Sequence, residues 1–362
     1  MKAPDDLAPR WFAQALLAWF DAHRRALPWR GSPDAYGVWL SEIMLQQTRV
    51  DTVVPYYLRF LERYPTVAAL AEAPLDEVLG AWSGLGYYRR ARSLHAAAQA
   101  VVDRHGGSFP RELSALRALP GVGAYTAGAI ASIAFGERTP LVDGNVARVL
   151  SRLFALGDPL GTSASDRALW ATAERLVPDE RPGDFNQALM ELGATVCTPD
   201  RPRCERCPVA ERCRARLEGR ELELPVPRAR KAPTRLRLVA AVVRGPDGLL
   251  LARRPAGGLY GGLWEPPMVE GGLREAKATL AEAGVSLGAK RGAIEHVLTH
   301  RRLAIVVHSG RVDGTIRALA PYEELAFVSD PEGGAIGLST MAKRVLSIST
   351  VEATSPRAGR RR

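Results

Sequence analysis

Lysine is nearly absent from this sequence: its 362 residues include five, and none lies between Ala3 and Arg230. A lysine amine is the usual nucleophile of enzymes that form a Schiff base, so the gap argues against that chemistry in this stretch. The N-terminus also lacks the apolar core of a signal peptide, and no apolar run approaches the roughly 18 residues of a membrane span. We therefore expect a protein without a secretion signal or membrane association, located in the cytoplasm (at the nucleoid if the source is bacterial).

Basic residues are in excess. Lys and Arg number 49 against 39 Asp and Glu, which gives a net charge of +10 and a pI near 9.8. The excess is uneven, because residues 201–237 contain twelve basic and five acidic side chains and the last ten residues add four arginines. Such a charge balance favours a polyanionic partner, with nucleic acid as the first candidate.

The hydrophobic pattern changes near residue 238. Before it, apolar residues recur at helical spacing and Gly/Pro pairs separate the segments. This predicts helices over 11–20, 38–44, 51–63, 89–104, 145–155, 165–177 and 185–194. After it, 238–243 and 249–251 flank Gly-Pro-Asp-Gly and predict a hairpin, with another strand at 304–308 and a helix at 273–283. We expect a helical domain (1–217), a basic linker (218–237), a smaller α+β domain (238–346) and a disordered basic tail (347–362).

Four cysteines fall within seventeen residues: Cys197, Cys204, Cys207 and Cys213. Crowded thiols in a long chain without a secretory signal favour metal binding over disulfides. Four thiolates in one loop can hold zinc or an iron–sulfur cluster, but only one pair has the CxxC spacing of a zinc knuckle. Interleaved arginines either offset thiolate charge or, as we favour, dock on phosphate; they are Arg201, Arg203, Arg206, Arg212, Arg214 and Arg216.

A second motif lies at LSALRALPGVGAYTAGAIASIAF, residues 113–135, which reads as helix, Pro-Gly-Val-Gly turn, helix. Gly121, Val122 and Gly123 would bring backbone N–H groups against a phosphate, as in a helix-hairpin-helix clamp on the DNA backbone.

Two carboxylates stand in distinctive surroundings, Glu42 in LSEIMLQQT and Asp143 in LVDGNV. In isolation, Asp143 would be a turn residue or helix cap and Glu42 a solvated helical side chain. A carboxylate pair is nonetheless what cleavage of an N-glycosidic bond requires. One protonates the departing base, and the other stabilises the cationic sugar by charge or by a covalent bond. Spacing alone does not pair them.

These motifs occur together and in order in one family. The cysteine spacing, LPGVGAYTAGAI, VDGNV, WLSEIMLQQTRV and GLGYYRRA resemble the helix-hairpin-helix DNA glycosylases with an iron–sulfur cluster, and within them the MutY-type adenine DNA glycosylases. The resemblance runs from Trp11 to Cys213. It implies a 4Fe–4S cluster on the four cysteines and, as partner, double-stranded DNA with adenine opposite 8-oxoguanine or guanine. We expect the chain to act as a monomer.

The resemblance also assigns roles to single residues. It makes Asp143 the catalytic aspartate, Asn145 its neighbour on the sugar side, and Glu42 the acid that protonates adenine at N7. Tyr125 stands where the bifunctional endonuclease III branch has its Schiff-base lysine. Together with the lysine gap, this predicts a glycosylase without lyase activity.

Further residues match positions that hold DNA bases. Arg25, Trp29, Arg30 and Leu45 match positions lining the pocket for flipped adenine, although Trp29 and Leu45 would also suit ordinary core packing. Gln187 matches the residue that reads the polar edge of the base. Gln47 and Tyr87 match residues that probe or intercalate at the opposing base, as base flipping requires.

The smaller domain resembles the MutT-like (Nudix-fold) domain of the same family. Its lesion-sensing Phe-Ser-His loop is replaced here by Leu298, Thr299 and His300, so the strength of 8-oxoguanine discrimination stays open. A Nudix hydrolase is disfavoured, because REAKATLAEAG (274–284) dilutes the carboxylates that such a helix needs. The remaining alternatives are an endonuclease III-like glycosylase with lyase activity and a non-catalytic iron–sulfur DNA-binding protein.

Overall fold

The computed structural model describes residues 9–30, 34–228, 232–298, 300–331, 333 and 336–350. The chain forms two compact units. The first comprises Met1–Glu72 and Ser93–Arg230, and the second comprises Ala73–Arg92 and Lys231–Arg362.

The first unit is helical, and the seven helices predicted from the sequence are confirmed within a few residues of their predicted ends. Its longer helices are α1 (Pro9–His23), α2 (Ala35–Leu45), α3 (Val50–Arg63), α6 (Arg89–His105), α9 (Gly144–Leu153), α10 (Ser163–Leu176) and α11 (Pro182–Thr195). Shorter segments connect them: η1 (Pro28–Arg30), α4 (Val67–Glu72), α7 (Leu113–Arg117), α8 (Ala124–Ala129), η2 (Ile130–Ala134), η3 (Cys204–Arg206), η4 (Ala210–Arg212) and α12 (Arg214–Leu217). The first four residues of α6 belong to the second unit.

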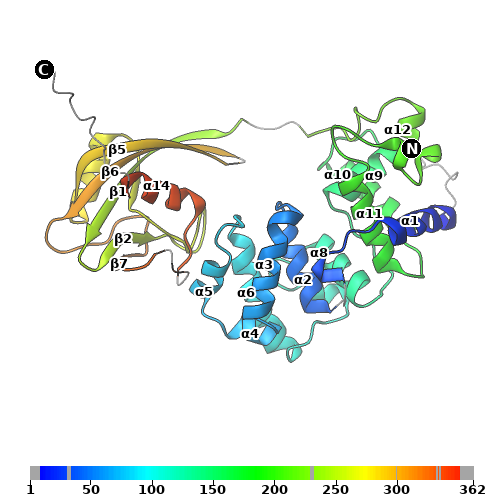
Figure 1. Ribbon diagram of the computed structural model, residues 1–362, viewed down its shortest axis with the longest axis horizontal. Helices are drawn as coiled ribbons and strands as arrows, with labels where there is room; N and C mark the ends of the chain where they lie inside the picture. The colour runs from blue at the N-terminus through cyan, green and yellow to red at the C-terminus, as the bar shows by residue number, and fades with distance from the viewer. Residues whose placement is uncertain are drawn as a thin grey trace, which may run out of the picture. The chain divides into compact units, whose positions relative to one another are not determined.

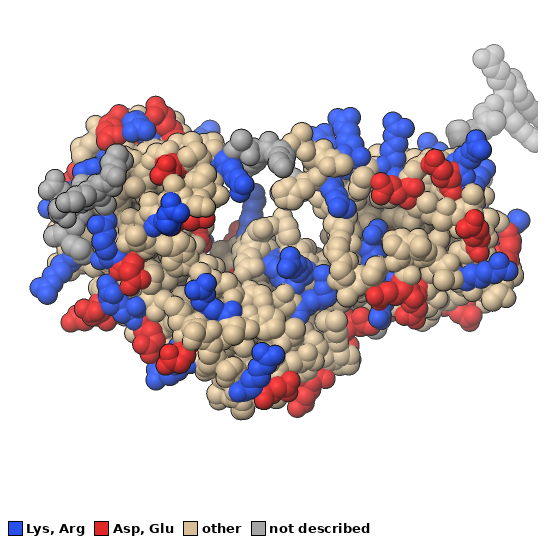
Figure 2. Space-filling view, turned by 180° about the vertical axis from the view of Figure 1, so that it is seen from behind, with Lys and Arg blue, Asp and Glu red and all other residues tan. Residues whose placement is uncertain are grey.

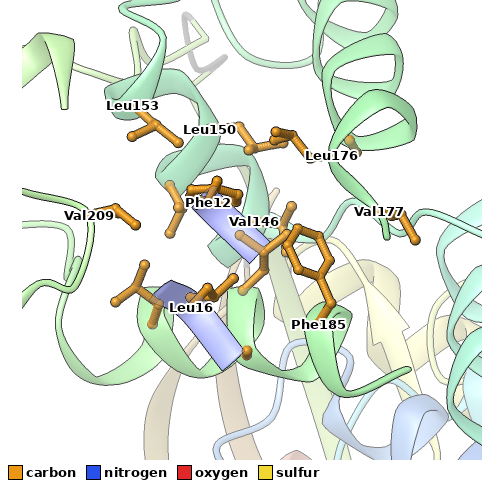
Figure 3. Close-up of a cluster of buried hydrophobic side chains, with 14 of the residues drawn as sticks. Phe12, Leu16, Val146, Leu150, Leu153, Leu176, Val177, Phe185 and Val209 are labelled. Carbon is orange, nitrogen blue, oxygen red and sulfur yellow. The ribbon is translucent and has the colours of Figure 1, made fainter. Parts of the chain in front are cut away.

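One apolar core holds α1, α9, α10 and α11 together (Figure 3). Phe12 of α1 meets Phe185 of α11 edge to face, with ring centroids 5.8 Å apart. Both rings are fully buried, and each contributes about 1.5–3 kcal/mol of burial free energy. Val209 of the cysteine loop and Val146 of α9 reach the same core, so this core fixes the loop relative to the start of α9.

The second unit contains a mixed sheet of seven strands. The strands run in the order β3-β2-β1-β6-β5, with β4 paired to β1 and β7 paired to β2, and β1 and β6 are parallel. They are β1 (Thr234–Gly245), β2 (Gly248–Arg253), β3 (Trp264–Glu265), β4 (Met268–Glu270), β5 (Val285–Val297), β6 (Arg301–Val312) and β7 (Glu324–Val328). The predicted hairpin, the strand at 304–308 and the helix at 273–283 are confirmed as β1–β2, β6 and α13 (Leu273–Glu282).

Helices cover opposite faces of this sheet, because successive residues of a strand point to opposite sides. Ala240 and Val242 of β1 pack in the core that includes α14 (Thr340–Thr350), which Figure 1 shows in red against the sheet. Ala241 and Val243 pack in the core that includes α13. The result is a sheet between two helices, which confirms the expected α+β MutT-like domain.

Two predicted boundaries differ from the structure. β1 begins at Thr234, within the segment expected to be linker, because it pairs with β6 from Arg301 onward. α14 extends to Thr350, so residues 347–350 are helical rather than disordered. Ile348 is the physical reason, since it packs against the sheet core beyond Val345 and Leu346. The remainder of the expected tail, 351–362, lies outside the described residues.

The structure also assigns α5 (Leu75–Ala81) and the residues up to Arg92 to the second unit, which the sequence did not predict. Charge is distributed broadly: on the face in Figure 2, basic side chains occur over both units, with acidic ones among them. No helix within the described ranges is both long enough and apolar enough to cross a bilayer.

Candidate active site

Glu42 is a buried carboxylic acid on an otherwise apolar helix. Asp34 caps α2 by accepting hydrogen bonds from the N–H groups of Tyr36 and Gly37, and the helix is buried from Tyr36 to Met44. Glu42 lies in this stretch with 4% of its surface exposed. Its polar partner is Tyr125 of α8, whose hydroxyl donates to Oε2 of Glu42.

Burial makes Glu42 a weak acid. It raises the pKa of Glu42 from 4.5 to about 7; the Tyr125 hydrogen bond and Arg30 oppose this, and the negative charge of Asp143 adds to it. At neutral pH, Glu42 is therefore protonated in about half of the molecules, which suits a proton donor. The same burial raises the pKa of Tyr125 well above its usual value, so Tyr125 remains a neutral hydrogen-bond donor.

Asp143 begins α9 as its N-cap. One carboxylate oxygen accepts from the N–H of Val146 at 2.7 Å, and the other accepts from Nδ2 of Asn145 at 2.9 Å. Burial raises the pKa of Asp143, and these two hydrogen bonds hold the rise down. The charge of Asp143 acts on both Glu42 and Tyr125, so the structure brings together the two carboxylates that sequence spacing could not pair.

Asn145 is in turn fixed by a hydrogen bond from Arg148. Arg148 donates through Nη2 to Oδ1 of Asn145 and to the carbonyl of Gly193, both at 2.8 Å, and through Nε to the carbonyl of Cys197 at 2.7 Å. A continuous hydrogen-bonded path therefore connects Asp143 with the backbone of the cysteine loop.

Gly193 permits this close approach of α9 and α11. A Cβ at position 193 would lie 2.7 Å from Cβ of Asn145 and 3.0 Å from its carbonyl oxygen. We expect Gly193→Ala to destabilise the fold by about 1–3 kcal/mol through overpacking, measured by urea unfolding. Gly144→Ala is the matched control, because no atom lies within 4 Å of its added Cβ. A Gly193→Ala protein as stable as the control would contradict this packing argument.

A buried ion-pair cluster lies beside the carboxylates, centred on Glu191 of α11. Glu191 is 1% exposed and bonds Nε of Arg25 at 2.6 Å and Nη2 of Arg30 at 2.9 Å. Burial alone would raise the pKa of Glu191, but the two guanidinium groups outweigh it and lower the pKa. Sequence reasoning missed Glu191; the available signal was an acidic side chain one helical turn after Gln187 in FNQALMELG.

Arg30 connects this cluster with Glu42. Its guanidinium lowers the pKa of Glu42, while its Nε is buried and has no hydrogen-bond partner among the described residues. Trp29 is 8% exposed and packs edge to face on Tyr57. Leu45 and Gln187 are half-buried. Of the predicted pocket residues, Arg30 is the one whose charge affects the pKa of Glu42.

The hairpin turn has the geometry expected for backbone contacts. Gly121 has φ +74°, and an added Cβ would lie 2.5 Å from Cβ of Ser93, so only glycine fits. Val122 is buried, and Gly123 caps α8 without a side-chain hydrogen bond. Gly121 and Gly123 are exposed, so the main chain of the turn is accessible.

Gln47 and Tyr87, the two residues expected to probe the opposing base, both have left-handed backbones. Their φ angles are 58° and 49°, and both side chains are exposed. A non-glycine residue in this region costs of order 1–3 kcal/mol, and such strain concentrates at functional sites.

The four cysteines are free thiols, each partly buried. Burial raises the pKa of Cys207 to about 12, and the nearby thiols of Cys197, Cys204 and Cys213 add to the rise, so all four lie within electrostatic range. Arg152, which is 2% exposed, directs Nη1 at Sγ of Cys197, 3.4 Å away. Within the described ranges, no three His, Cys, Asp or Glu side chains converge on a single-ion site.

The predicted lesion-sensing loop joins β5 to β6. Thr299 lies outside the described residues. His300 is exposed, whereas Leu298 packs against the sheet core. Val297, the last residue of β5 before this loop, is an exposed apolar side chain, with 62% of its surface accessible.

Both domains of the chain match known protein families. Residues 40–175 match the family of HhH-GPD superfamily base excision DNA repair proteins, and residues 238–347 match the NUDIX domain. Adenine DNA glycosylase of Homo sapiens is 39% identical over 402 residues, covering 93% of this chain and 73% of that protein. That of Rattus norvegicus is 39% identical over 399 residues, covering 93% and 77%. The chain belongs to the adenine DNA glycosylase family.

Solved structures extend the likeness of this adenine DNA glycosylase family member to its fold. A thermostable thymine-DNA glycosylase has a TM-score of 0.52 at 32% identity, covering 58% of this chain and 97% of that one. Endonuclease III in a non-covalent DNA complex has a TM-score of 0.50 at 24% identity, covering 59% and 98%, and this likeness concerns the fold alone.

Proposed function

We propose that this chain is a monofunctional adenine DNA glycosylase of base excision repair. It hydrolyses the N-glycosidic bond of adenine paired with 8-oxoguanine or guanine and leaves an abasic site. The observation that carries the proposal is a buried Glu42 that accepts a hydrogen bond from Tyr125 and lies within electrostatic range of Asp143. Two carboxyl groups whose surroundings give them different pKa values are the mark of an acid and a charge stabiliser.

Glu42 supplies the proton. Its protonated form donates to N7 of adenine, which makes the base a better leaving group. Asp143 acts as the carboxylate of the pair, and the hydrogen bonds from Val146 and Asn145 limit the rise in its pKa that burial causes. It then stabilises the cationic sugar by charge or by a bond, and water completes the hydrolysis.

The flipped base would be held by groups from α11 and η1. Nε of Arg30, buried without a hydrogen-bond partner in the described part of the chain, can donate to an acceptor nitrogen of adenine. Gln187 can form two hydrogen bonds with the polar edge of the base, and Trp29 and Leu45 supply apolar contact. Glu191 fixes the guanidinium groups of Arg25 and Arg30 and is a positioning residue.

The remaining DNA contacts follow from the predicted roles. Gly121–Gly123 and the arginines of the cysteine loop would contact phosphates, with Gln47 and Tyr87 at the opposing base. Leu298, Thr299 and His300 would contact 8-oxoguanine. The proposal includes that the protein acts as a monomer and is located in the cytoplasm.

The cysteine loop fits a 4Fe–4S cluster. Its donor set is four free thiols close enough to influence one another, three of which pack on the helical core. Cys197, Cys204, Cys207 and Cys213 would hold the cluster, which when bound ties the loop together and can accept or release an electron. Arg152 fixes the loop through the carbonyls of Thr198 and Pro199, at 2.7 and 2.8 Å. Purified protein should be brown; a colourless zinc protein would refute this assignment.

One assay separates the proposal from its alternatives. Protein is incubated with a duplex containing adenine opposite 8-oxoguanine, and samples are analysed with and without alkali. We expect free adenine, with strand breaks only after alkali. Breaks without alkali would indicate a lyase, and intact DNA would indicate a non-catalytic DNA-binding protein.

Tyr125→Phe tests the assignment of the proton donor. The Tyr125 hydrogen bond lowers the pKa of Glu42, so its removal raises that pKa and keeps Glu42 protonated to higher pH. We expect the alkaline limb of the single-turnover rate profile to move to higher pH. An unchanged limb would show that another group governs it.

A further inference from the structure

The segment carrying Tyr87 is built into the second unit. Ser83 Oγ and Tyr88 OH both donate to the carbonyl of Leu338, at 3.0 and 2.8 Å. Tyr88 is 4% exposed, so its hydrogen bond is shielded from water. Tyr87, whose backbone is left-handed, therefore lies between two residues that are anchored to Leu338, just before α14.

A turn at 257–263 (GGLYGGL) lies next to Leu338 and Arg92. Trp264, directly after it, bridges to Leu338 and donates its N–H to the carbonyl of Gly337 at 2.9 Å. Arg92, from the end of the anchored segment, donates to the carbonyl of Gly261. A Cβ on Gly261 would lie 2.4 Å from the carbonyl oxygen of Ala256, so the turn is tightly closed.

Tyr260 connects this turn with the end of β5. Its φ is +56°, an unusual conformation for a bulky residue, and its hydroxyl lies 3.0 Å from Nε2 of His296. His296 immediately precedes the exposed Val297. Charged and titratable groups face both members of this pair. Glu265, Tyr88 and Arg254 affect the pKa of Tyr260, and Arg344 affects the pKa of His296. Burial, with Arg344, lowers the pKa of His296 and keeps it neutral, while burial raises the pKa of Tyr260 and keeps it a hydrogen-bond donor.

We infer that the turn at 257–263 is a brace that holds Tyr87 and the end of β5, at His296 and Val297, as one recognition surface. Tyr260 and Arg92 are its positioning residues, and neither need contact the DNA. The ligand class is the purine opposite adenine, and the brace sets how strongly an 8-oxopurine is preferred over guanine. This inference rests on the proposed function, because that function places Tyr87 and residues 298–300 at the opposing base.

If the turn acts as a brace, its loss should slow adenine release opposite 8-oxoguanine more than release opposite guanine. Tyr260→Phe keeps the ring and removes one hydrogen bond, so we expect the ratio of single-turnover adenine release opposite 8-oxoguanine to that opposite guanine to fall about 3- to 10-fold. The rate opposite guanine should stay within about twofold of the unsubstituted protein. Arg92→Met, which removes the other contact of the turn, should produce the same selective loss.

Ser286→Ala serves as the control, since it removes a hydroxyl hydrogen bond to Asp313 elsewhere in the same unit. It should leave both rates unchanged. The inference is overturned if both substituted proteins keep the ratio, or if both rates fall equally, because equal loss would reflect general destabilisation. If the unsubstituted full-length protein releases no adenine from either duplex, the proposed function itself fails.

Discussion

Asp143→Asn is expected to bind a duplex containing adenine opposite 8-oxoguanine yet release adenine about a thousandfold more slowly or worse. The substitution removes a negative charge that would face the cationic sugar, while leaving the size of the side chain unchanged. Asparagine is also as good an N-cap as aspartate, so its oxygen still accepts from the N–H of Val146 and α9 still begins at Gly144. Single-turnover release of adenine and a gel-shift titration measure the two properties.

Asp143→Ala separates charge from capping. It removes both, so it should lose activity and also about 0.5–2 kcal/mol of unfolding free energy. Appreciable turnover by Asp143→Asn would contradict a charged or covalent role for this residue. Equal destabilisation by both substitutions would contradict the capping argument.

Glu42→Gln should lower the rate of adenine release about 10²- to 10⁴-fold, the usual contribution of general acid catalysis. Glutamine keeps an oxygen that accepts from Tyr125 but has no acidic proton. In the unsubstituted protein the rate should fall above pH 7, as Glu42 loses its proton. A Glu42→Gln protein that retains the alkaline fall in rate would show that Glu42 is not the group responsible.

Although Glu42→Gln should lower activity, it should raise the free energy of unfolding relative to the unsubstituted protein as the pH increases. The pKa of Glu42 is 4.5 unperturbed and about 7 when buried, so the folded state holds the proton more tightly than the unfolded state. Stability is therefore lost as pH rises from 4.5 to 7, by about 3 kcal/mol in total. Glu42→Gln avoids that loss, so its stability relative to the unsubstituted protein should grow across this range in urea unfolding. A difference independent of pH would contradict the buried, titrating acid.

The elements predicted from sequence were those with a strong local signal. The helices of the first unit have clear apolar periodicity and start signals such as the N-cap Thr162 and Pro182 at the first position of α11, and β1 and β2 flank an obvious turn. β5 was missed because most of its residues are exposed or half-buried, so neither alternation nor an apolar run marks it. Its position depends on pairing with β6, which is a property of the folded chain.

The candidate site shows the same division. Glu42, Asp143 and Tyr125 were nominated from motifs, but that they act on one another depends on packing of α2, α8 and α9. In the sequence, Glu191 resembles any acidic residue of a helix. Its role depends on Arg25 and Arg30, which bind it from outside its own helix. Long-range partners of this kind leave no periodic trace in a sequence.

The inclusion of Ala73–Arg92 in the second unit has a consequence for dissecting the molecule. The chain passes between the units at three points, after Glu72, after Arg92 and after Arg230. A protease cut near residue 230 would therefore leave two fragments that remain associated through the hydrogen bonds of Ser83 and Tyr88 to Leu338. A C-terminal fragment expressed alone would lack α5, and the backbone at Gly262 and Gly337, which now lies close to Leu79, would be exposed to water.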